Sequence, residues 1–279
     1  MKINEVLKKN DFRFNKKFGQ NFITDGNLLD MIVEKSEIGN EDVVIEIGCG
    51  AGTLTSAIAK KAKRVIGFEI DENLRPVLDE TLSGYDNIEI VYKDVMKVSD
   101  DEIKTLAGGR FSLIANLPYY ITTPIIMRFA EDFECVKRIV VTVQEEVADR
   151  LCAKAGSPEY GAITAGIDAV GTCEKVLRID RKMFFPSPNV DSAVVKIDID
   201  RNKYGIEDIK AYRAGVRSAF SSRRKTLANN LMMSFGFSRR EAEEIVLTVK
   251  SDVMARGETL TTADFVKLSE ELSKRNIKL

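Results

Sequence analysis

Apolar and polar positions follow two alternating periods from about residue 42 to residue 199. Short apolar runs typical of buried strands occupy residues 42–47, 64–69, 88–92, 111–115 and 136–143. Apolar positions between these runs recur at helical spacing in residues 53–61, 72–82 and 123–133. Strands that alternate with helices predict a parallel, doubly wound α/β sheet with helices on its faces.

Two further apolar runs, residues 175–179 and 192–199, resemble a closing antiparallel pair. After about residue 201 no strand pattern remains. Helical patterns there cover about 209–220, 228–235, 239–249 and 263–274. We therefore expect an α/β domain over residues 1–203, whose segment 1–26 contacts ligands, and a small all-helical domain over residues 204–279.

The amino-acid composition argues against several kinds of catalytic and metal-binding site. The chain has no histidine, so the commonest general base and the triads that depend on it are absent. Its four cysteines, Cys49, Cys135, Cys152 and Cys173, are scattered and include no Cys-x-x-Cys pair, which argues against a metal site. No apolar run is long enough for a bilayer and the N-terminus lacks a secretory pattern, so we expect a cytoplasmic protein.

The net charge of −1 gives no indication of a nucleic-acid partner, but the distribution of basic residues along the chain is informative. A segment without acidic residues contains Lys210, Arg213, Arg217, Arg223, Arg224 and Lys225. A second basic group near the N-terminus includes Lys16 and Lys17. Such runs more often form solvated helix faces, but local basic stripes on a near-neutral protein can also bind phosphate.

The first strand ends in a glycine-rich turn, Glu46-Ile47-Gly48-Cys49-Gly50-Ala51-Gly52-Thr53. Glycines allow a backbone to approach a ligand closely at the start of a helix, although they also serve turns without a ligand. The third glycine comes one residue earlier than in the dinucleotide fingerprint, which argues against a pyrophosphate ligand. Cys49 lies inside this turn, and we interpret it as a small space-filling residue rather than a nucleophile.

Polar residues follow three neighbouring strands where an open α/β sheet binds its ligand. Glu69 ends the second strand and suits ribose hydroxyls, Asp94 follows the third and could accept from an adenine amine, and Asn116 follows the fourth. A single acid after a strand is usually a cap. Three polar residues in register beside a glycine-rich turn favour a cofactor site.

Asn116-Leu117-Pro118-Tyr119-Tyr120 carries the most specific signal. Sequences of this type mark methyltransferases that act on exocyclic amines. The Asn oxygen and a backbone carbonyl can accept the two N–H bonds of adenine N6, which localises the nitrogen lone pair. Pro118 stiffens the turn and Tyr119 can stack on the base. Because a sulfonium methyl donor is already activated, no strong base is required, in agreement with the absence of histidine.

The chain resembles, nearly end to end, the family of ribosomal RNA small-subunit adenine dimethyltransferases associated with kasugamycin sensitivity. The motifs that carry the resemblance are residues 17–23 (KFGQNFI), 46–52 (EIGCGAG), 116–119 (NLPY), 184–193 (FFPSPNVDSA) and 219–227 (AFSSRRKTL). Ile23 stands where leucine is usual, and Cys49 replaces the common proline or alanine.

The resemblance implies a class I, Rossmann-like sheet of seven strands and S-adenosylmethionine as cofactor. Cofactor contacts are implied for Asn21, Ile23, Gly48, Gly50, Glu69, Asp94 and Asn116. Contacts with the target base are implied for Asn116, Leu117, Tyr119 and Phe184. RNA contacts are expected from Lys16, Lys17, Arg217, Arg223, Arg224 and Lys225.

The implied substrate is a pair of adjacent adenosines in the 3′-terminal hairpin loop of small-subunit (16S) rRNA, each dimethylated at N6 during subunit biogenesis. We expect a monomer that needs neither membrane nor metal. A large-subunit rRNA methyltransferase of the macrolide-resistance type is the nearest alternative, since it shares the fold and the catalytic motif. A non-catalytic ribosome-assembly factor and a methyltransferase of small molecules are weaker alternatives.

Overall fold

The computed structural model describes residues 3–15 and 18–275. Contacts within the chain divide it into two compact units. The first comprises residues 1–148 and 174–199, and the second comprises residues 149–173 and 200–279.

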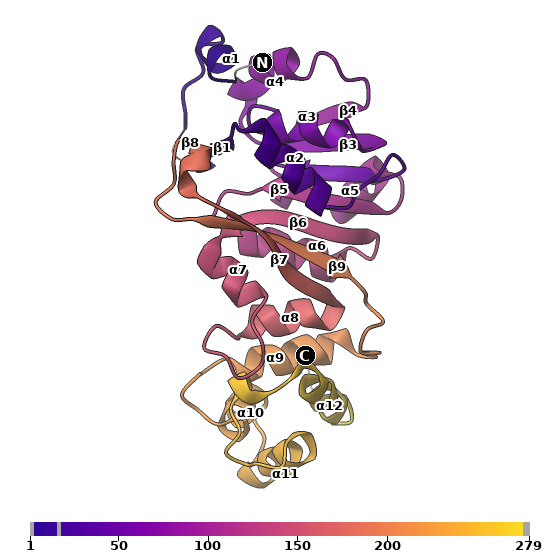
Figure 1. Cartoon of the computed structure of the whole chain (residues 1–279). Coiled ribbons are helices and arrows are strands. Elements are labelled where there is room, and N and C mark those ends of the chain that lie inside the picture. Colours follow the sequence, from indigo (N-terminus) through magenta and orange to yellow (C-terminus); the bar gives the residue numbers. More distant parts are fainter. Residues whose placement is uncertain (1–2, 16–17, 276–279) are drawn as a thin grey trace. The chain divides into compact units, whose positions relative to one another are not determined.

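A seven-stranded sheet dominates the first unit, and only the first residues of β7 belong to the second (Figure 1). Its strands are β2 (Val43–Ile47), β3 (Arg64–Glu69), β4 (Ile88–Tyr92), β5 (Phe111–Asn116), β6 (Val136–Gln144), β7 (Gly171–Ile179) and β9 (Ser192–Ile199). Their order is β4-β3-β2-β5-β6-β9-β7, and the first five strands in this order run parallel. Because β9 runs antiparallel to β6 and enters between β6 and β7, the expected closing pair is present.

Helices accompany the parallel strands. They are α2 (Gly26–Lys35), α3 (Thr53–Ala59), α4 (Arg75–Thr81), α5 (Asp100–Ala107), α6 (Thr122–Asp132) and α7 (Glu145–Leu151). Leu28, Ile32 and Ile58 pack with Val44 and Ile114 of the sheet in one buried cluster. Strands covered in this way are apolar at successive positions, which is why the sequence showed continuous apolar runs.

A second, two-stranded sheet joins the N-terminal segment to a distant loop. β1 (Phe22–Ile23) pairs antiparallel with β8 (Phe184–Phe185), so that Phe22 lies opposite Phe185. The rings of Phe12, Phe14, Phe22 and Phe185 form a chain of edge and tilted contacts. α1 (Ile3–Lys9) packs beside α4, and Lys9 pairs with Glu80. The sequence analysis predicted α4 within residues 72–82, but not α1, β1 or β8.

The second unit consists of helices. They are α8 (Ala162–Val170), α9 (Ile209–Ala219), α10 (Leu227–Phe235), α11 (Arg239–Val249) and α12 (Thr262–Ser273). The Asp168 carboxylate of α8 accepts hydrogen bonds from Lys203, Tyr204 and Thr262. Tyr212, buried on α9, donates from its hydroxyl to the Ala165 carbonyl. These bonds place residues 149–173 with the C-terminal helices, whereas the sequence pattern assigned them to the α/β domain.

No helix in the described residues is long and apolar enough to cross a membrane.

The glycine turn after β2 is packed tightly against β3. A Cβ on Gly67 would lie 2.4 Å from Cys49 Sγ and 2.7 Å from Ile90 Cδ1. Cys49 is itself buried, and burial raises the pKa of its thiol well above the ordinary value. The inert thiol therefore fills the space that Gly67 leaves, as the sequence predicted.

Gly67→Ala should destabilise the protein by about 1–3 kcal/mol, because the added methyl group overpacks the space occupied by Cys49. Cys49→Ala in the same chain should restore part of this loss, and the two changes should therefore be non-additive. Urea unfolding of the single and double variants measures the coupling. Gly84→Ala is the control, since no atom lies within 4 Å of the position that its methyl group would take, and it should be nearly neutral. Additive losses would show that Cys49 and Gly67 do not share this space.

Candidate active site

The glycine turn has a backbone that glycine favours at three positions. Gly48, Gly50 and Gly52 have φ angles of +75°, +55° and +79°, in the left-handed region. The Gly48 N–H donates to the Phe68 carbonyl at 2.8 Å, which fixes the turn to the end of β3. A Cβ on Gly50 would lie 2.8 Å from the ring of Phe22. The absence of a side chain at Gly50 thus allows the Phe22 ring to pack directly against the turn.

Glu69 connects this turn to the end of the neighbouring strand. Its Oε2 accepts from Gly50 N–H at 2.8 Å, and its Oε1 accepts from the Ile70 and Asp71 N–H groups at 2.9 Å. Burial raises the pKa of Glu69, whereas the three N–H donors oppose that rise. The side chain is 4% exposed and lines the same pocket as Gly48 and Gly50.

Glu46 lines this pocket from β2 and is fully buried. Neither of its carboxyl oxygens makes a well-formed hydrogen bond, although the neighbouring Thr55 hydroxyl acts to lower the carboxyl pKa. Burial raises the pKa of Glu46 to about 8. A buried carboxyl group without partners is costly when ionised, so this position favours a cationic ligand.

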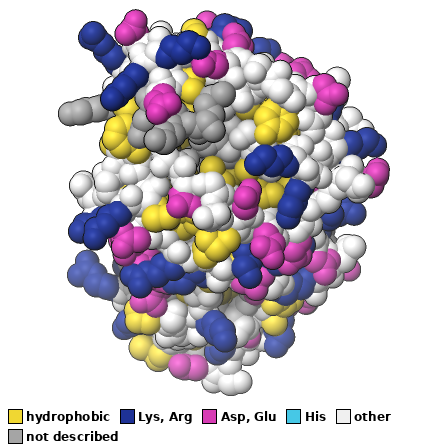
Figure 2. Space-filling model, turned by 45° about the horizontal axis from the view of Figure 1, so that its top comes forward, with side chains coloured by type: hydrophobic (Ala, Val, Ile, Leu, Met, Phe, Trp, Pro, Cys, Tyr) yellow, Lys and Arg dark blue, Asp and Glu magenta, His cyan; other side chains and the backbone are white. Residues whose placement is uncertain are grey.

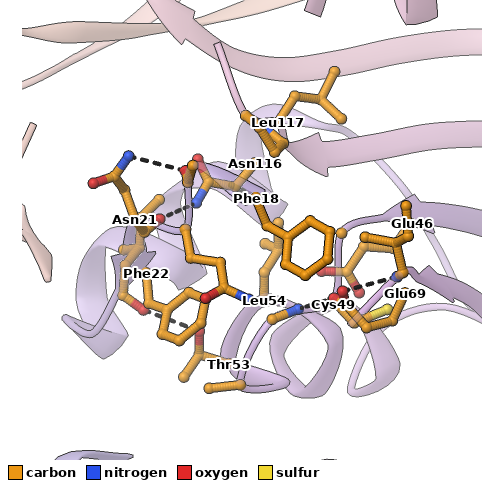
Figure 3. Close-up of a pocket in the computed structure, with 18 of the residues that line it drawn as sticks. Phe18, Asn21, Phe22, Glu46, Cys49, Thr53, Leu54, Glu69, Asn116 and Leu117 are labelled. Atoms are coloured by element: carbon orange, nitrogen blue, oxygen red, sulfur yellow. Dashed lines mark hydrogen bonds between the residues drawn. The ribbon is translucent and has the colours of Figure 1, made fainter. Parts of the chain in front are cut away.

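Asn116 ends β5 at the other side of the pocket, where a contact with the N-terminal segment orients its amide (Figure 3). Its Nδ2 donates to the Asn21 carbonyl at 2.8 Å. Asn21 in turn donates from its side chain to the Gly19 carbonyl at 3.1 Å. This bond fixes the orientation of the amide, and Oδ1 is the atom with which Asn116 can accept from a hydrogen-bond donor in the pocket.

Tyr119 follows Asn116 in the turn before α6 and is half-buried. Its hydroxyl lies 2.8 Å from Oγ of Ser192, the fully buried first residue of β9. Burial raises the pKa of Tyr119, and the contact with Ser192 opposes that rise. The contact with Ser192 therefore holds the hydroxyl end of the Tyr119 ring. Leu117, in the same turn, is buried.

The N-terminal segment completes the pocket with Phe18, Gly19, Gln20 and Phe22. The Ile23 carbonyl accepts from Thr53 Oγ1 at 2.9 Å, and Gln20 Nε2 donates to Asp71 Oδ2 at 2.8 Å. The segment is therefore fastened both to the glycine turn and to the end of β3. Figure 3 shows Phe18 among the side chains around the pocket.

Most of the expected cofactor residues meet in this pocket: Asn21, Ile23, Gly48, Gly50, Glu69 and Asn116. Asp94 does not line it, because its carboxylate caps the 3-10 turn at Val95–Lys97 by accepting from Met96 N–H. Phe184 does not line it either. Its ring is 4% exposed within the apolar cluster of the sheet, while its neighbour Phe185 is 45% exposed. The proposed ligand contacts of Asp94 and Phe184 stay predictions.

The expected RNA-contacting residues of the second unit are at its surface. Arg217, Arg224 and Lys225 are exposed, and Lys225 Nζ lies 2.8 Å from Met233 Sδ. Arg223 is also exposed, but it donates to the Tyr160 carbonyl at 3.0 Å and so has a structural contact. Lys16 and Lys17 lie outside the described residues. On the face drawn in Figure 2, basic and acidic side chains are interspersed.

Comparison with known proteins decides the family. The family model "Ribosomal RNA adenine dimethylase" matches residues 11–274. The chain belongs to the ribosomal RNA adenine dimethylase family. It is 42% identical to "Ribosomal RNA small subunit methyltransferase A" of Clostridioides difficile, over 97% of this chain and 95% of that protein.

Two solved structures of similar proteins cover 91% of the chain. A dimethyladenosine transferase from Plasmodium falciparum aligns with a TM-score of 0.78, at 27% identity and over 98% of that chain. The 23S rRNA methyltransferase ErmE aligns with a TM-score of 0.69, at 25% identity and over its full length. The predicted fold class is confirmed, as is the prediction of an adenine dimethylase that uses S-adenosylmethionine.

The pocket of this adenine dimethylase suits that cofactor. S-adenosylmethionine carries a sulfonium and an ammonium group, and the pocket contains two buried carboxyl groups, Glu46 and Glu69. The oxygens of Glu46 make no well-formed hydrogen bond, so a cation beside them would offset the cost of their burial. The backbone space above Gly48 provides room, since a Cβ there would meet nothing within 4 Å.

Three kinds of residue around the pocket were not predicted from the sequence. Glu46 was placed in the motif but given no role, although an acid at the end of an apolar run signals a buried charge. Phe18 and Gln20 were recognised only as part of a motif. Ser192 was missed because it lies 73 residues from Tyr119, a distance at which spacing carries no signal.

Glu46 should make the stability of the ligand-free protein depend on pH. Below the ordinary carboxyl pKa of 4.5 the group is protonated in both folded and unfolded chains, and stability is unaffected. Between 4.5 and about 8 only the unfolded chain loses the proton, so stability falls through this window. Each pKa unit corresponds to about 1.4 kcal/mol, which gives a loss on the order of a few kcal/mol.

Glu46→Gln should therefore raise the melting temperature of the ligand-free protein at pH 8 more than at pH 5. Thermal unfolding across this range measures the difference. Exposed Glu159→Gln is the control and should leave the pH profile unchanged. A parent and a Gln variant with parallel profiles would show that Glu46 is ionised at neutral pH.

Proposed function

We propose that this protein transfers methyl groups from S-adenosylmethionine to N6 of two adjacent adenosines in the 3′-terminal hairpin loop of small-subunit rRNA. Each adenosine receives two methyl groups, during small-subunit biogenesis. The observation that carries the proposal is the Asn116 amide, whose orientation is fixed by the hydrogen bond from its nitrogen to the Asn21 carbonyl and whose oxygen can accept from an amine.

The chemistry follows from that orientation. Adenine N6 is a weak nucleophile because its lone pair is delocalised into the ring. An acceptor at Asn116 Oδ1 holds one N–H of the amine and favours a pyramidal nitrogen. Tyr119 stacks on the base after it has left the RNA stack, and buried Leu117 supports the turn. The released proton needs no strong base, in keeping with a chain that has no histidine.

The cofactor supplies an activated methyl group beside this position. Glu69 accepts hydrogen bonds from its ribose hydroxyls, and Glu46 compensates its positive charge. Gly48 leaves room for the cofactor beside the glycine turn, and Gly50, Asn21 and Ile23 line the same pocket. Asp94 would accept from the adenine amine of the cofactor with Oδ2, while Oδ1 caps the turn at Val95–Lys97.

The small subunit is favoured over the large subunit by two comparisons. Identity with the Clostridioides difficile small-subunit methyltransferase is 42%, against 25% with the 23S rRNA methyltransferase ErmE. The segments 184–193 and 219–227 also resemble the small-subunit family. A non-catalytic assembly factor is disfavoured, because a binding-only protein has no need of the oriented Asn116. We further propose that the protein acts in the cytoplasm as a monomer, without a metal ion.

The test uses purified small and large subunits that lack these methyl groups. Both are incubated with the protein and labelled cofactor, and the modified nucleotides are mapped. We expect up to four methyl groups per small subunit, on two adjacent adenosines of the terminal hairpin. Label on the large subunit alone would support the alternative enzyme, and cofactor binding without any transfer would support the assembly factor.

Tyr119→Ala should reduce methyl transfer by one to two orders of magnitude, because stacking on a base is worth about 1–3 kcal/mol. Tyr119→Phe should cost less than about tenfold, since it keeps the ring and loses one hydrogen bond of about 1 kcal/mol. Ser192→Ala should match the Phe variant, because it removes the other partner of that bond. Single-turnover rates at saturating cofactor measure all three. A Phe variant as poor as the Ala variant would assign the essential role to the hydroxyl.

Arg217, Arg223, Arg224 and Lys225 are proposed to bind rRNA phosphates, and the test leaves Arg223 in place because it also donates to the Tyr160 carbonyl. Replacing the other three residues with Ala should lower the slope of log affinity against log salt by roughly 0.7–0.9 for each lost contact. Titration of small subunits at several salt concentrations measures this slope. Arg239→Ala with Arg240→Ala is the control, since these arginines pair with Glu243 and Glu244 on α11. An unchanged slope in the triple variant would rule out this surface as the RNA contact.

A further inference from the structure

Two cysteines that are far apart in sequence meet in the second unit. Cys152 directly follows α7, and Cys173 lies at the start of β7. Their sulfur atoms are 3.0 Å apart, although 21 residues separate them. A disulfide requires an S–S distance of about 2.05 Å, so the two sulfurs need to approach by only about 1 Å.

Small reagents can reach this pair. Both thiols line a cavity of about 340 Å³ within the second unit, together with Lys154, Tyr160 and Asp168. Each cysteine is partly exposed, whereas Cys49 is buried beneath the glycine turn. A thiol in contact with solvent and with a second thiol meets the two geometric conditions for disulfide formation.

The backbone around the cavity holds the two cysteines in place. Thr164 Oγ1 of α8 donates to the Arg150 carbonyl at 2.6 Å, two residues before Cys152. Asp168, on the same helix, accepts from Tyr204 and Thr262. The chain leaves the first unit after Ala148 and returns to it at Glu174, so the cysteines lie near the two ends of this excursion.

We propose that Cys152 and Cys173 form a reversible disulfide when the protein meets a peroxide or a small-molecule disulfide. With hydrogen peroxide, one thiolate attacks an oxygen and the O–O bond breaks, which gives a sulfenic acid and one water. The second thiolate then attacks that sulfur, the S–O bond breaks and a second water leaves. The two thiols lose two electrons to the peroxide, and a dithiol reductant reverses the reaction.

The disulfide closes a loop that contains α8. Such a link restricts the unfolded chain more than the folded chain, and the second unit should therefore become more resistant to heat. Disulfides in proteins of reducing compartments are usually transient and redox-sensing. The pair is therefore a site at which an oxidant can stabilise the α8 segment without touching the methyltransferase pocket, whose lining belongs to the first unit.

Peptide mapping of the full-length protein tests the proposal directly. The reduced protein is treated with hydrogen peroxide or oxidised glutathione, remaining thiols are alkylated, and trypsin is added without a reductant. Trypsin cleaves after Lys154, between the two cysteines, so the disulfide appears as residues 151–154 linked to residues 155–175. We expect this linked pair to account for two of the four thiols, and dithiothreitol to restore both.

Cys135 provides the matched control, since it is also partly exposed but lies in the first unit. Cys135→Ser should leave the linked peptides and the oxidation-dependent rise in melting temperature unchanged. Cys152→Ser and Cys173→Ser should each abolish both. Oxidation of Cys135 before the pair, or separate glutathionylation of Cys152 and Cys173 without a link, would overturn the proposal. Because the mapping needs no variant and no methyl transfer, its result is independent of the proposed function.

Discussion

The hydrogen bond from Gly50 N–H to Glu69 joins the ends of two parallel strands, and the geometry of the pocket depends on it. The turn after β2 can be bent sharply only because its glycines adopt positive φ angles. Without a partner at β3, the turn would leave a buried N–H unsatisfied. Glu69 also accepts from Ile70 and Asp71, so one carboxylate sets the shape of both strand ends. The shape of the pocket at this edge of the sheet is therefore set mainly by backbone N–H groups that bond to the Glu69 carboxylate.

Glu46 differs from Glu69, because it is a second buried carboxyl group in the pocket and burial favours its neutral form. Glu69 has three N–H donors to compensate its burial, while Glu46 has no N–H donor and no well-formed hydrogen bond. A structural role alone does not explain such a fully buried acid, since a glutamine or a leucine there would cost less. A carboxyl group that is neutral when the pocket is empty and gains from a nearby positive charge is consistent with a cationic cofactor, and the same group lowers the stability of the ligand-free protein near neutral pH.

The sequence predicted the features that local rules determine. Continuous apolar runs marked the strands, because helices cover both faces of the sheet, and Glu69 and Asn116 were found because parallel strands end at one edge. Long-range contacts left no such signal. The bond of Tyr119 to Ser192 and the meeting of Cys152 with Cys173 depend on where distant segments fold. Residues 149–173 lie in the second compact unit, although the sequence pattern placed them in the α/β domain, and the bonds of Asp168 that hold them there join segments far apart in the sequence.

The N-terminal segment connects the two halves of the pocket. The Asn21 carbonyl orients Asn116, the Ile23 carbonyl holds Thr53 at the start of α3, and Gln20 reaches Asp71 beyond the end of β3. A cofactor that touches the glycine turn and a base that touches Asn116 therefore meet the same few residues. The hydrogen bond from Asn116 Nδ2 to the Asn21 carbonyl ties the direction of the amide to the position of this segment. The same few N-terminal residues therefore set both the wall of the pocket beside the glycine turn and the orientation of the Asn116 amide.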